Sequence, residues 1–360
     1  MQIGIVGLPF SGKSTLFQTL TKTHLDPSAL AKAETHQAVV KVPDKRLDKL
    51  TEIFKPLKKT NAAIEFVDVI GLKKGETGST QFTNNFLSKV KTNDSLIQVI
   101  RIFENDLVQH PEGKIDMMRD IESFETEFIL SDMSIIEKRI QNLKKQILKM
   151  QDDQMKKELL LLEKSLDFIQ REHPLREAGF SKEDLQMLRG FQLLSVKPML
   201  IALNFDESQI NDTEKFLDQV LKNKVGRNTK VLSFFGKIEM EMSELSENEA
   251  KDFMKEYNIR ESALNNIIRE SYELLGLHSF FTVGEDECRA WTIKKGMNAQ
   301  EASGAIHTDF YNKFIRAEVV HYDDFIKSGT FPKAKELGLW RLEGKEYIVK
   351  DGDIISVRHS

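Results

Sequence analysis

The chain has 360 residues, of which 40% are hydrophobic and 30% are charged, with a formal net charge of −4. This composition predicts a globular protein of about two or three domains and argues against a globally basic nucleic-acid coat. No apolar run approaches the roughly 20 residues that span a bilayer, and Met1 leads straight into a strand without room for a signal peptide. The single cysteine, Cys288, excludes an internal disulfide and favours a reducing cytoplasm.

The first predicted element is a short apolar strand, Ile3-Gly4-Ile5-Val6, which runs into Gly7-Leu8-Pro9-Phe10-Ser11-Gly12-Lys13-Ser14 and a helix-compatible stretch from Thr15. This is a P-loop in its strand–loop–helix setting, where backbone N–H groups and the start of a helix surround phosphate oxygens. Lys13 would neutralise the β- and γ-phosphates, and Ser14 would bind Mg²⁺. The alternative is a glycine turn with a chance Lys-Ser pair.

A second strand, from Ala62 to Val67, ends in Asp68-Val69-Ile70-Gly71, which has the D-x-x-G pattern that follows a P-loop in GTPase-like domains. Asp68 would hold Mg²⁺ through water, and the Gly71 N–H could sense the γ-phosphate. Leu72 stands where Ras-like enzymes carry a water-orienting glutamine, and an aliphatic side chain cannot orient water. Leu72 packing in the core is equally compatible with the pattern.

A strand from Ser95 to Phe103 precedes a loop with His110-Pro111-Glu112-Gly113. Much later, an apolar strand from Pro198 to Leu203 delivers Asn204-Phe205-Asp206-Glu207, where a GTPase would place N-K-x-D. The N-x-x-E pattern lacks the lysine and carries a longer acid, which weakens guanine selectivity and makes ATP a serious candidate. Asn204 as an ordinary turn residue is the alternative.

Between about Asp120 and His173 there is neither Gly nor Pro, and apolar residues recur at intervals of three and four. This pattern predicts a coiled-coil hairpin that turns near Asp152-Asp153. A further capped helix is expected from Ser181 to about Leu194. Lysines on the hairpin, Lys144, Lys145, Lys149, Lys156 and Lys157, could contact RNA or simply form a solvated face.

From about Gly276 the pattern changes to short strands, expected at 279–283, 287–292, 318–320, 346–350 and 354–358, with a helix at 298–306. These elements predict a small mixed sheet. Its charges are balanced, so the electrostatic argument for nucleic-acid binding by this region is weak. His307 has no nucleophile or metal ligand at a recognisable spacing, which favours a structural role.

Several motifs together resemble the YchF/Obg-like ATPase family. They are the P-loop, the run from Val42 to Leu50, Asp68-Val-Ile-Gly-Leu-Lys-Lys-Gly, Asn204-x-x-Glu207, Ala290 to Gly296, Gly304 to Phe310, Arg316-Ala317-Glu318, Arg341 to Lys345 and Tyr347 to Asp353. The resemblance covers nearly the whole chain. It implies an ATPase of GTPase ancestry with a hydrophobic residue in place of the catalytic glutamine, as Leu72 is here, and a C-terminal TGS domain that suggests a ribosome or RNA contact.

The resemblance also implies a catalytic histidine on a mobile loop, and the matching position is His110. Its imidazole titrates near neutrality, and a loop flanked by Pro and Gly can swing. A solvated loop residue is the alternative. The predicted catalytic residues are therefore Lys13 and His110.

Other positions depart from the family. Phe10 replaces an asparagine that is associated with a monovalent cation, so K⁺ dependence is not expected. Lys32 occupies the slot of the Mg²⁺-sensing threonine, with Thr35 the nearest substitute. Ser79-Thr80-Gln81-Phe82-Thr83 replaces the usual Gly-x-Gly-Leu-Gly segment. Ser233-Phe234-Phe235-Gly236-Lys237 replaces the small Ser/Cys-Ala type loop beside the base. These changes suggest a divergent member with low turnover.

The expected fold is α/β: a Ras-like P-loop domain (1–125 and 195–275), a helical coiled-coil insertion (126–194) and an α+β ubiquitin-like TGS domain (276–360). Metal ligands are expected at Ser14, Asp68 through water, and Thr35. The predicted nucleotide contacts are Gly7, Leu8, Pro9, Phe10, Ser11, Gly12, Lys13, Ser14, Thr15, Gly71, Phe103, Asn204, Phe205, Glu207, Phe235 and Gly236.

The predicted function is a cytoplasmic, monomeric regulatory ATPase that uses Mg²⁺ and associates with the ribosome or RNA through the helical arm and the TGS domain, with no membrane partner. Two alternatives stay open. One is a ribosome- or RNA-binding module that holds nucleotide with little hydrolysis, and the other is a GTP-selective translational GTPase.

Overall fold

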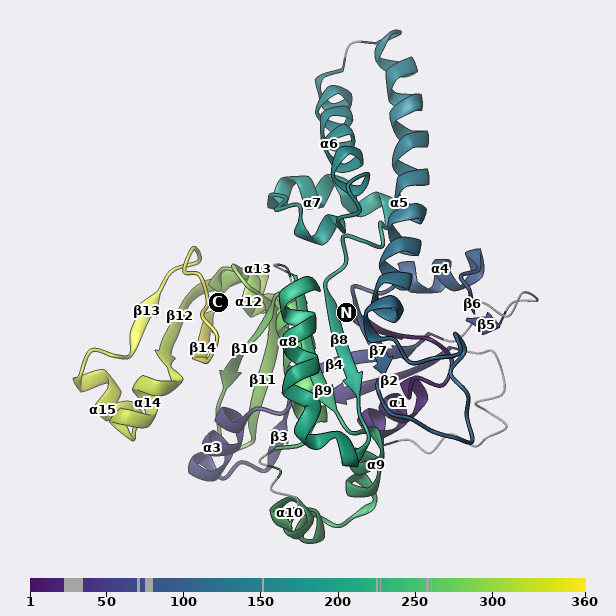
Figure 1. The fold of residues 1–360 in the computed structure, drawn as a ribbon. Coiled ribbons are helices and arrows are strands. Elements are labelled where there is room, and N and C mark those ends of the chain that lie inside the picture. Colours follow the sequence, from purple (N-terminus) through teal and green to yellow (C-terminus); the bar gives the residue numbers. More distant parts are fainter. Residues whose placement is uncertain are drawn as a thin grey trace. The chain divides into compact units, whose positions relative to one another are not determined.

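The computed structural model describes residues 1–22, 35–69, 72–74, 80–150, 152–224, 226, 228–256, 259 and 261–360. The chain forms two compact units: residues 1–38 with 65–274, and residues 39–64 with 275–360. The ribbon is shown in Figure 1. Within the described residues, none of the helices combines the length and the apolar character needed to cross a membrane.

The first unit is built on a sheet of strand order β2-β4-β1-β7-β8-β9, in which β4, β1, β7, β8 and β9 run parallel. Parallel strands are covered on both faces, which explains why β7 and β8 are buried at every residue. The strands of this sheet are β1 (Gln2–Val6), β2 (His36–Lys41), β4 (Ala63–Asp68), β7 (Ser95–Arg101), β8 (Met199–Asn204) and β9 (Thr229–Phe234), and β5 (Lys73–Lys74) pairs with β6 (Thr80–Gln81) in a separate sheet.

Helices α4, α5 and α8 share one apolar core with this sheet, in which Phe86, Phe124 and Val220 are buried. Helix α11 contacts β7, β8 and β9, and α1 packs against α9. The helices are α1 (Lys13–Thr21), α4 (Asn84–Lys91), α5 (Met117–Ile147), α6 (Asp153–Ile169), α7 (Lys182–Leu188), α8 (Thr213–Lys224), α9 (Gly236–Glu244), α10 (Glu247–Glu256) and α11 (Ala263–Leu274), with short 3-10 turns at Leu175–Glu177, Arg189–Phe191 and Glu207–Asp212. The α/β P-loop architecture predicted from the sequence is confirmed.

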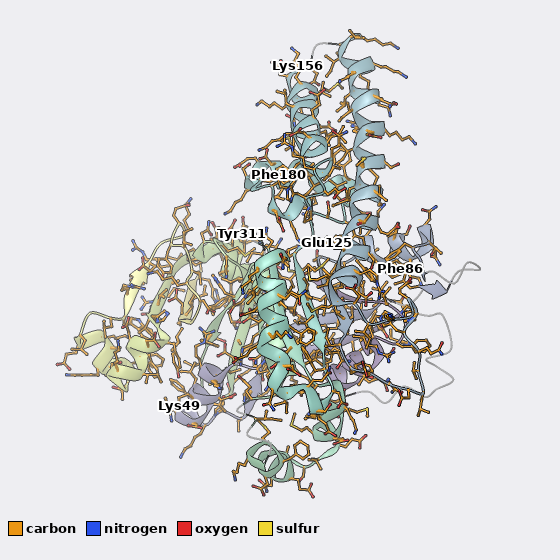
Figure 2. All side chains as sticks on the ribbon, viewed as in Figure 1. Lys49, Phe86, Glu125, Lys156, Phe180 and Tyr311 are labelled. Carbon is orange, nitrogen blue, oxygen red and sulfur yellow. The ribbon has the colours of Figure 1, made fainter. Side chains whose placement is uncertain are left out.

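The predicted coiled-coil hairpin is present as α5 and α6, which lie side by side (Figure 1). Asp152 caps α6 by accepting hydrogen bonds from the Gln154 and Met155 N–H groups, so the turn falls where the sequence placed it. A second apolar core, containing Ile136, Ile140 and Leu162, holds the two helices together. Figure 2 shows Lys156 near the tip of this arm and Phe180 near its base.

The predicted boundary of the helical insertion, residue 126, falls inside one continuous helix. Helix α5 begins at Met117, capped by the Asp116 carboxylate, and runs without a break into the arm. Its first half carries Phe124 and Phe128 in the core of the sheet, and its second half carries Ile136 in the core of the arm. One helix therefore serves both regions.

The second unit contains a mixed sheet of order β13-β12-β14-β10-β11-β3. Its strands are β3 (Lys58–Thr60), β10 (Leu277–Thr282), β11 (Glu287–Lys294), β12 (Phe314–His321), β13 (Arg341–Glu343) and β14 (Asp353–His359), and its helices are α3 (Lys45–Phe54), α12 (Ala299–Ile306), α13 (Thr308–Asn312), α14 (Tyr322–Ser328) and α15 (Phe331–Glu336). The mixed sheet and the α12 helix were predicted, and the structure confirms both.

Two predictions for this unit need correction. Residues 346–350 do not form a strand: Tyr347 N–H closes a turn on Gly344 O, and pairing is limited to a single bridge between Ile348 and Asn298. Residues 39–64, predicted to belong to the P-loop domain, group with the second unit because β3 pairs with β11 and Arg46 binds Asp351 at 2.9 Å. Neither long-range contact leaves a periodic signal in the sequence.

Candidate nucleotide-binding site

The loop after β1 is shaped by two glycines that closely approach other backbone and side-chain atoms. A Cβ on Gly7 would meet Val99 O at 2.5 Å, and one on Gly12 would meet the Asn204 Nδ2 at 2.1 Å. Gly12 also has a φ of +96°, which side chains rarely adopt, and it is the N-cap of α1. The predicted P-loop therefore has the glycines that its path requires.

Lys13, Ser14 and Asp68 meet beside this loop. The Lys13 ammonium donates to Leu8 O at 3.2 Å, and the Ser14 hydroxyl lies 3.4 Å from Asp68 Oδ2. Burial lowers the pKa of Lys13, and the charge of Asp68 opposes that shift. Burial also raises the pKa of Asp68, while Lys13 and His36 oppose the rise. The charged forms of Lys13 and Asp68 thus stabilise each other against the cost of burial.

Two buried oxygens at this site, Asp68 Oδ1 and Ser11 Oγ, have no hydrogen-bond partner among the described residues. An unsatisfied buried carboxylate oxygen is costly unless a cation or donor completes its environment. A hydroxyl beside a carboxylate offers the oxygen ligands that Mg²⁺ prefers. The residues present therefore fit a Mg²⁺–phosphate group.

Asn204 connects the P-loop to the loop after β9. Its Nδ2 donates to Ser11 O at 3.1 Å, and its Oδ1 accepts from Gly236 N–H at 3.0 Å. Both polar ends of this buried amide are thus used by the protein. Asn204 therefore holds two loops together and is not an ordinary turn residue.

The region around the predicted base contacts is aromatic beneath and charged at its exposed edge. The buried Phe205 ring lies 5.6 Å from the Phe216 ring and 6.0 Å from the Phe235 ring, measured between centroids. At the edge, the Lys237 ammonium lies 3.7 Å from the Glu207 carboxylate. Lys237, which was not among the predicted contacts, follows Gly236 and stands at the start of α9.

Phe10 is an outlier within the P-loop. It has a φ of +63°, and its side chain is 61% exposed. A bulky residue in the left-handed region is strained, and such strain collects at functional loops. No other predicted P-loop contact combines a side chain with this conformation in the described part of the loop.

His110 lies in a buried pair with Asp120, which the sequence did not indicate. Its Nε2 is 3.0 Å from Asp120 Oδ2, and both side chains are almost completely buried. The loop that carries His110 is held by Arg101, which donates to Phe103 O and Val108 O. Arg101 and Asp120 were missed, although a charged residue that ends an apolar strand was a usable signal for Arg101.

The other predicted residues lie as follows. Leu72 is half-buried against the sheet core, which agrees with a packing role. Thr35 precedes β2 and lines a pocket with Gln2, Gln37, Val67, Ser88, Lys89 and Thr92. The Phe103 ring lies under the Arg101 guanidinium at 4.7 Å. Gly71 and Lys32 fall outside the described residues.

Comparison with known proteins identifies the family. A family model described as a 50S ribosome-binding GTPase matches residues 2–164, and the YchF-GTPase C-terminal model, described as a protein of unknown function, matches residues 277–360. The Ribosome-binding ATPase YchF of Bacillus subtilis (strain 168) is 40% identical over 359 residues, covering 99% of this chain and 98% of the relative. The chain belongs to the YchF family.

Other YchF proteins agree with this assignment. The Ribosome-binding ATPase YchF of Escherichia coli O157:H7 is 39% identical over 355 residues, covering 98% of this chain and 97% of the relative. The solved structure of the Schizosaccharomyces pombe YchF GTPase superposes with a TM-score of 0.87 at 32% identity, covering 99% of this chain and 97% of that chain. The predicted resemblance and fold are thus confirmed over the full length.

Proposed function

We propose that this YchF protein is a ribosome-binding ATPase that converts ATP to ADP and phosphate slowly and acts as a monomeric regulatory switch in the cytoplasm. The observation that carries the proposal is the meeting of partly buried Lys13 and Ser14 with buried Asp68, beside a loop whose glycines cannot be replaced without a clash. The curated relatives named Ribosome-binding ATPase YchF support the activity and the partner.

In the proposed site, the Ser14 hydroxyl would hold Mg²⁺ and Asp68 would hold it through water, with Thr35 as a third candidate ligand. Bound Mg²⁺ would neutralise charge on the β- and γ-phosphates. Lys13 binds the same phosphates, and the N-terminus of α1 supplies N–H donors. Gly7, Leu8, Pro9 and Ser11 contribute backbone to this cradle, and Thr15 lies in the first turn of α1.

ATP is proposed over GTP because of the edge formed by Glu207 and Lys237. A guanine-reading carboxylate must accept from N1–H and the amino group, which requires free oxygens in a fixed position. Glu207 has a longer side chain than aspartate and lies within ion-pair distance of Lys237. A carboxylate shared with an ammonium is a poorer acceptor for guanine, so base selection shifts toward adenine.

His110 is proposed as the residue that handles the attacking water, since Leu72 cannot. In the structure its ring is buried and bound to Asp120, so this role requires the loop to move. Ribosome or RNA contact is proposed for the α5–α6 arm and the TGS-like C-terminal domain. The arm lysines Lys145, Lys149 and Lys157 are exposed, which leaves them available to phosphates.

Single-turnover hydrolysis of ATP and GTP, with and without ribosomes, tests the proposal. We expect ATP hydrolysis that rises with ribosomes and is lost in Lys13→Ala. Lys49→Ala is the matched control, because Lys49 is an exposed lysine paired with Glu52 in the second unit. Absence of hydrolysis of both nucleotides under both conditions would favour the nucleotide-holding module, and tight GTP binding with negligible ATP affinity would favour a GTPase.

A further inference from the structure

The His110 imidazole is fully engaged in its buried position. Nε2 lies 3.0 Å from Asp120 Oδ2, and Nδ1 accepts a hydrogen bond from Glu112 N–H at 3.2 Å. Because an acceptor nitrogen carries no proton, Nε2 must be the protonated nitrogen that donates to Asp120. Neither nitrogen is then left to receive a proton from water.

Burial and two nearby arginines favour the neutral form of the His110 ring. Burial is the main reason that the pKa of His110 lies below its ordinary value; Arg119 and Arg101 lower it further, and Asp120 opposes them. Burial likewise raises the pKa of Asp120, against hydrogen bonds from Arg119 and His110. Arg119 occupies the other oxygen, Asp120 Oδ1, through Nε at 3.0 Å and Nη2 at 2.7 Å.

The pair is built on rigid elements and bridges a loop. Gln98 on β7 donates to Asp120 O at 3.1 Å, which fixes the first turn of α5 against the sheet. Arg101 at the end of β7 holds Phe103 O and Val108 O, so the loop leaves the sheet in a defined direction. Between these anchors, Leu107 is 94% exposed. The loop is therefore buried against the protein at His110 and exposed to solvent at Leu107.

We infer that Asp120 is a positioning residue whose hydrogen bond holds the His110 ring in a buried, inactive position. Basal ATP hydrolysis is then limited by how often this hydrogen bond breaks and the ring is released. The inference rests on the role proposed for His110 above. A partner that opened the loop would free the imidazole and raise turnover without adding any catalytic group. Low basal hydrolysis then follows from a specific contact as well as from Leu72.

Weakening the contact without removing it provides the test. In Asp120→Asn, the amide oxygen can still accept from Nε2–H, but the hydrogen bond is no longer charge-assisted and is roughly half as strong. The amide nitrogen that replaces Oδ1 cannot accept from Arg119, so the side chain is also held less firmly. The released population rises, and we expect single-turnover ATP hydrolysis without ribosomes to increase about fivefold. Asp116→Asn is the matched control, because it makes the same chemical change at the exposed N-cap of α5 and should leave the rate unchanged.

The double variant His110→Ala with Asp120→Asn separates release of histidine from a general loosening of the fold. The increase must disappear in this background. An unchanged rate in Asp120→Asn, or an increase that persists without His110, overturns the inference.

A second readout follows His110 itself by NMR of labelled imidazoles, assigned by the signal missing from His110→Gln. In the wild-type protein we expect its titration midpoint below the ordinary value of about 6.5. In Asp120→Asn the midpoint should move up toward that value as the ring becomes solvated; a fixed or lower midpoint shows that the ring stays closed and contradicts the inference.

A raised midpoint without a faster rate also contradicts the inference, because His110 would then be released without consequence. That outcome removes the proposed role of His110 as well. It leaves hydrolysis that depends on Lys13 standing, so failure at the histidine and failure of the ATPase proposal are distinguishable.

Discussion

At the scale of single residues, the nucleotide site depends on the small size of Gly12. The Asn204 amide fills the space that a side chain would need, 2.1 Å from the expected Cβ position. This close approach joins the P-loop to the end of β8 and, through Gly236, to α9. A substitution at Gly12 is therefore expected to affect both ATP binding and the stability of the fold.

Gly12→Ala should lower both stability and ATP affinity, because it adds a clash to the left-handed strain of about 1–2 kcal/mol. Gly329→Ala is the control: Gly329 has a φ of +77°, and a Cβ there meets nothing within 4 Å. Thermal unfolding and ATP titration of both variants would check this. Equal destabilisation of the two, with ATP binding preserved in Gly12→Ala, would contradict the role given to the Asn204 contact.

Phe10→Asn should stabilise the protein by about 1 kcal/mol, because asparagine tolerates the left-handed region better than a bulky side chain. Phe10→Ala keeps a Cβ in the same conformation and should give no comparable gain. Denaturant unfolding of both variants measures the difference.

The asparagine in Phe10→Asn also supplies a side-chain oxygen to the P-loop. K⁺ should therefore stimulate ATP hydrolysis by Phe10→Asn more than by the wild-type protein. Strong K⁺ stimulation of the wild-type protein contradicts this prediction.

At the scale of elements, the base of the helical arm is tied to the sheet by a buried carboxylate. Asp132 on α5 accepts hydrogen bonds from Leu194 N–H, Ser195 N–H and the Ser195 hydroxyl, at 2.8, 2.7 and 2.7 Å. Burial raises the pKa of Asp132 from 3.8 to about 6, although these hydrogen bonds oppose the rise. The segment leading into β8 is thereby held to the arm.

The sign of this shift predicts a pH dependence. Because the pKa of Asp132 is higher in the folded state, its stabilising contribution is complete below about pH 4 and is lost as the pH rises through about 6. Between pH 4 and 7 the wild-type protein should lose about 2–3 kcal/mol more than Asp132→Asn, measured by urea unfolding. Asp167→Asn, at an exposed carboxylate on α6, should follow the wild type; identical profiles for the wild type and Asp132→Asn would refute the assignment.

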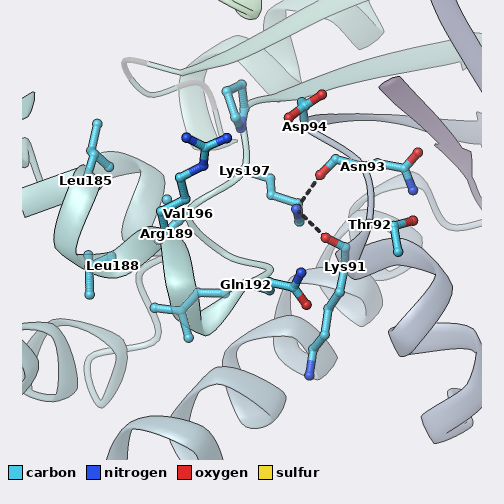
Figure 3. Close-up of a pocket in the computed structure, with 12 residues that line it drawn as sticks. Lys91, Thr92, Asn93, Asp94, Leu185, Leu188, Arg189, Gln192, Val196 and Lys197 are labelled. Atoms are coloured by element: carbon cyan, nitrogen blue, oxygen red, sulfur yellow. Dashed lines mark hydrogen bonds between the residues drawn. The ribbon is translucent and has the colours of Figure 1, made fainter. Parts of the chain in front are cut away.

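A second tie joins the same segment to α4, the helix that follows the D-x-x-G motif. The Lys197 ammonium donates to Lys91 O at 3.0 Å and to Asn93 O, as Figure 3 shows. These carbonyls lie at the end of α4, where helices leave acceptors unsatisfied. They line a pocket of about 340 Å³ with Leu188, Arg189 and Gln192.

Lys197→Met should cost about 1–3 kcal/mol, because two partly buried carbonyls lose their donor while the apolar stem remains. Hydrogen exchange of the last turn of α4 should become faster. Lys91→Met, which changes a side chain in the same pocket and keeps the carbonyl, is the control. Equal losses of stability in the two variants would show that the effect comes from changing the pocket and not from losing the Lys197 hydrogen bonds.

Many of the helices and strands could be predicted from the sequence, and the features that were missed have physical reasons. Apolar spacing predicted the hairpin and its turn, because Ile136, Ile140 and Leu162 belong to one buried apolar core between α5 and α6. No change in the pattern marks the predicted boundary at residue 126, because the helical repeat of α5 stays the same where its partner changes from the sheet to α6. Asp120 and Asp132 were missed, because a carboxylate on a helix gives no sequence signal that distinguishes a buried hydrogen bond from solvent.

At the scale of the whole molecule, the chain combines a P-loop unit that carries a helical arm with a second unit built on a mixed sheet. The P-loop, Asp68 and Asn204 were predictable because their spacing along strands is dictated by phosphate and Mg²⁺ chemistry. The assignment of residues 39–64 to the second unit was not, because pairing of β3 with β11 joins residues more than 200 positions apart. Local pattern carries no information on such pairing.

In the proposed function, the nucleotide site binds ATP through Lys13 and selects it over GTP through Glu207 and Lys237. Equilibrium titration of ATP and GTP in the presence of Mg²⁺ tests it most directly, with Lys13→Ala as the reference. We expect tighter binding of ATP than of GTP, and loss of ATP binding in Lys13→Ala. Tight binding of GTP with negligible affinity for ATP would contradict it.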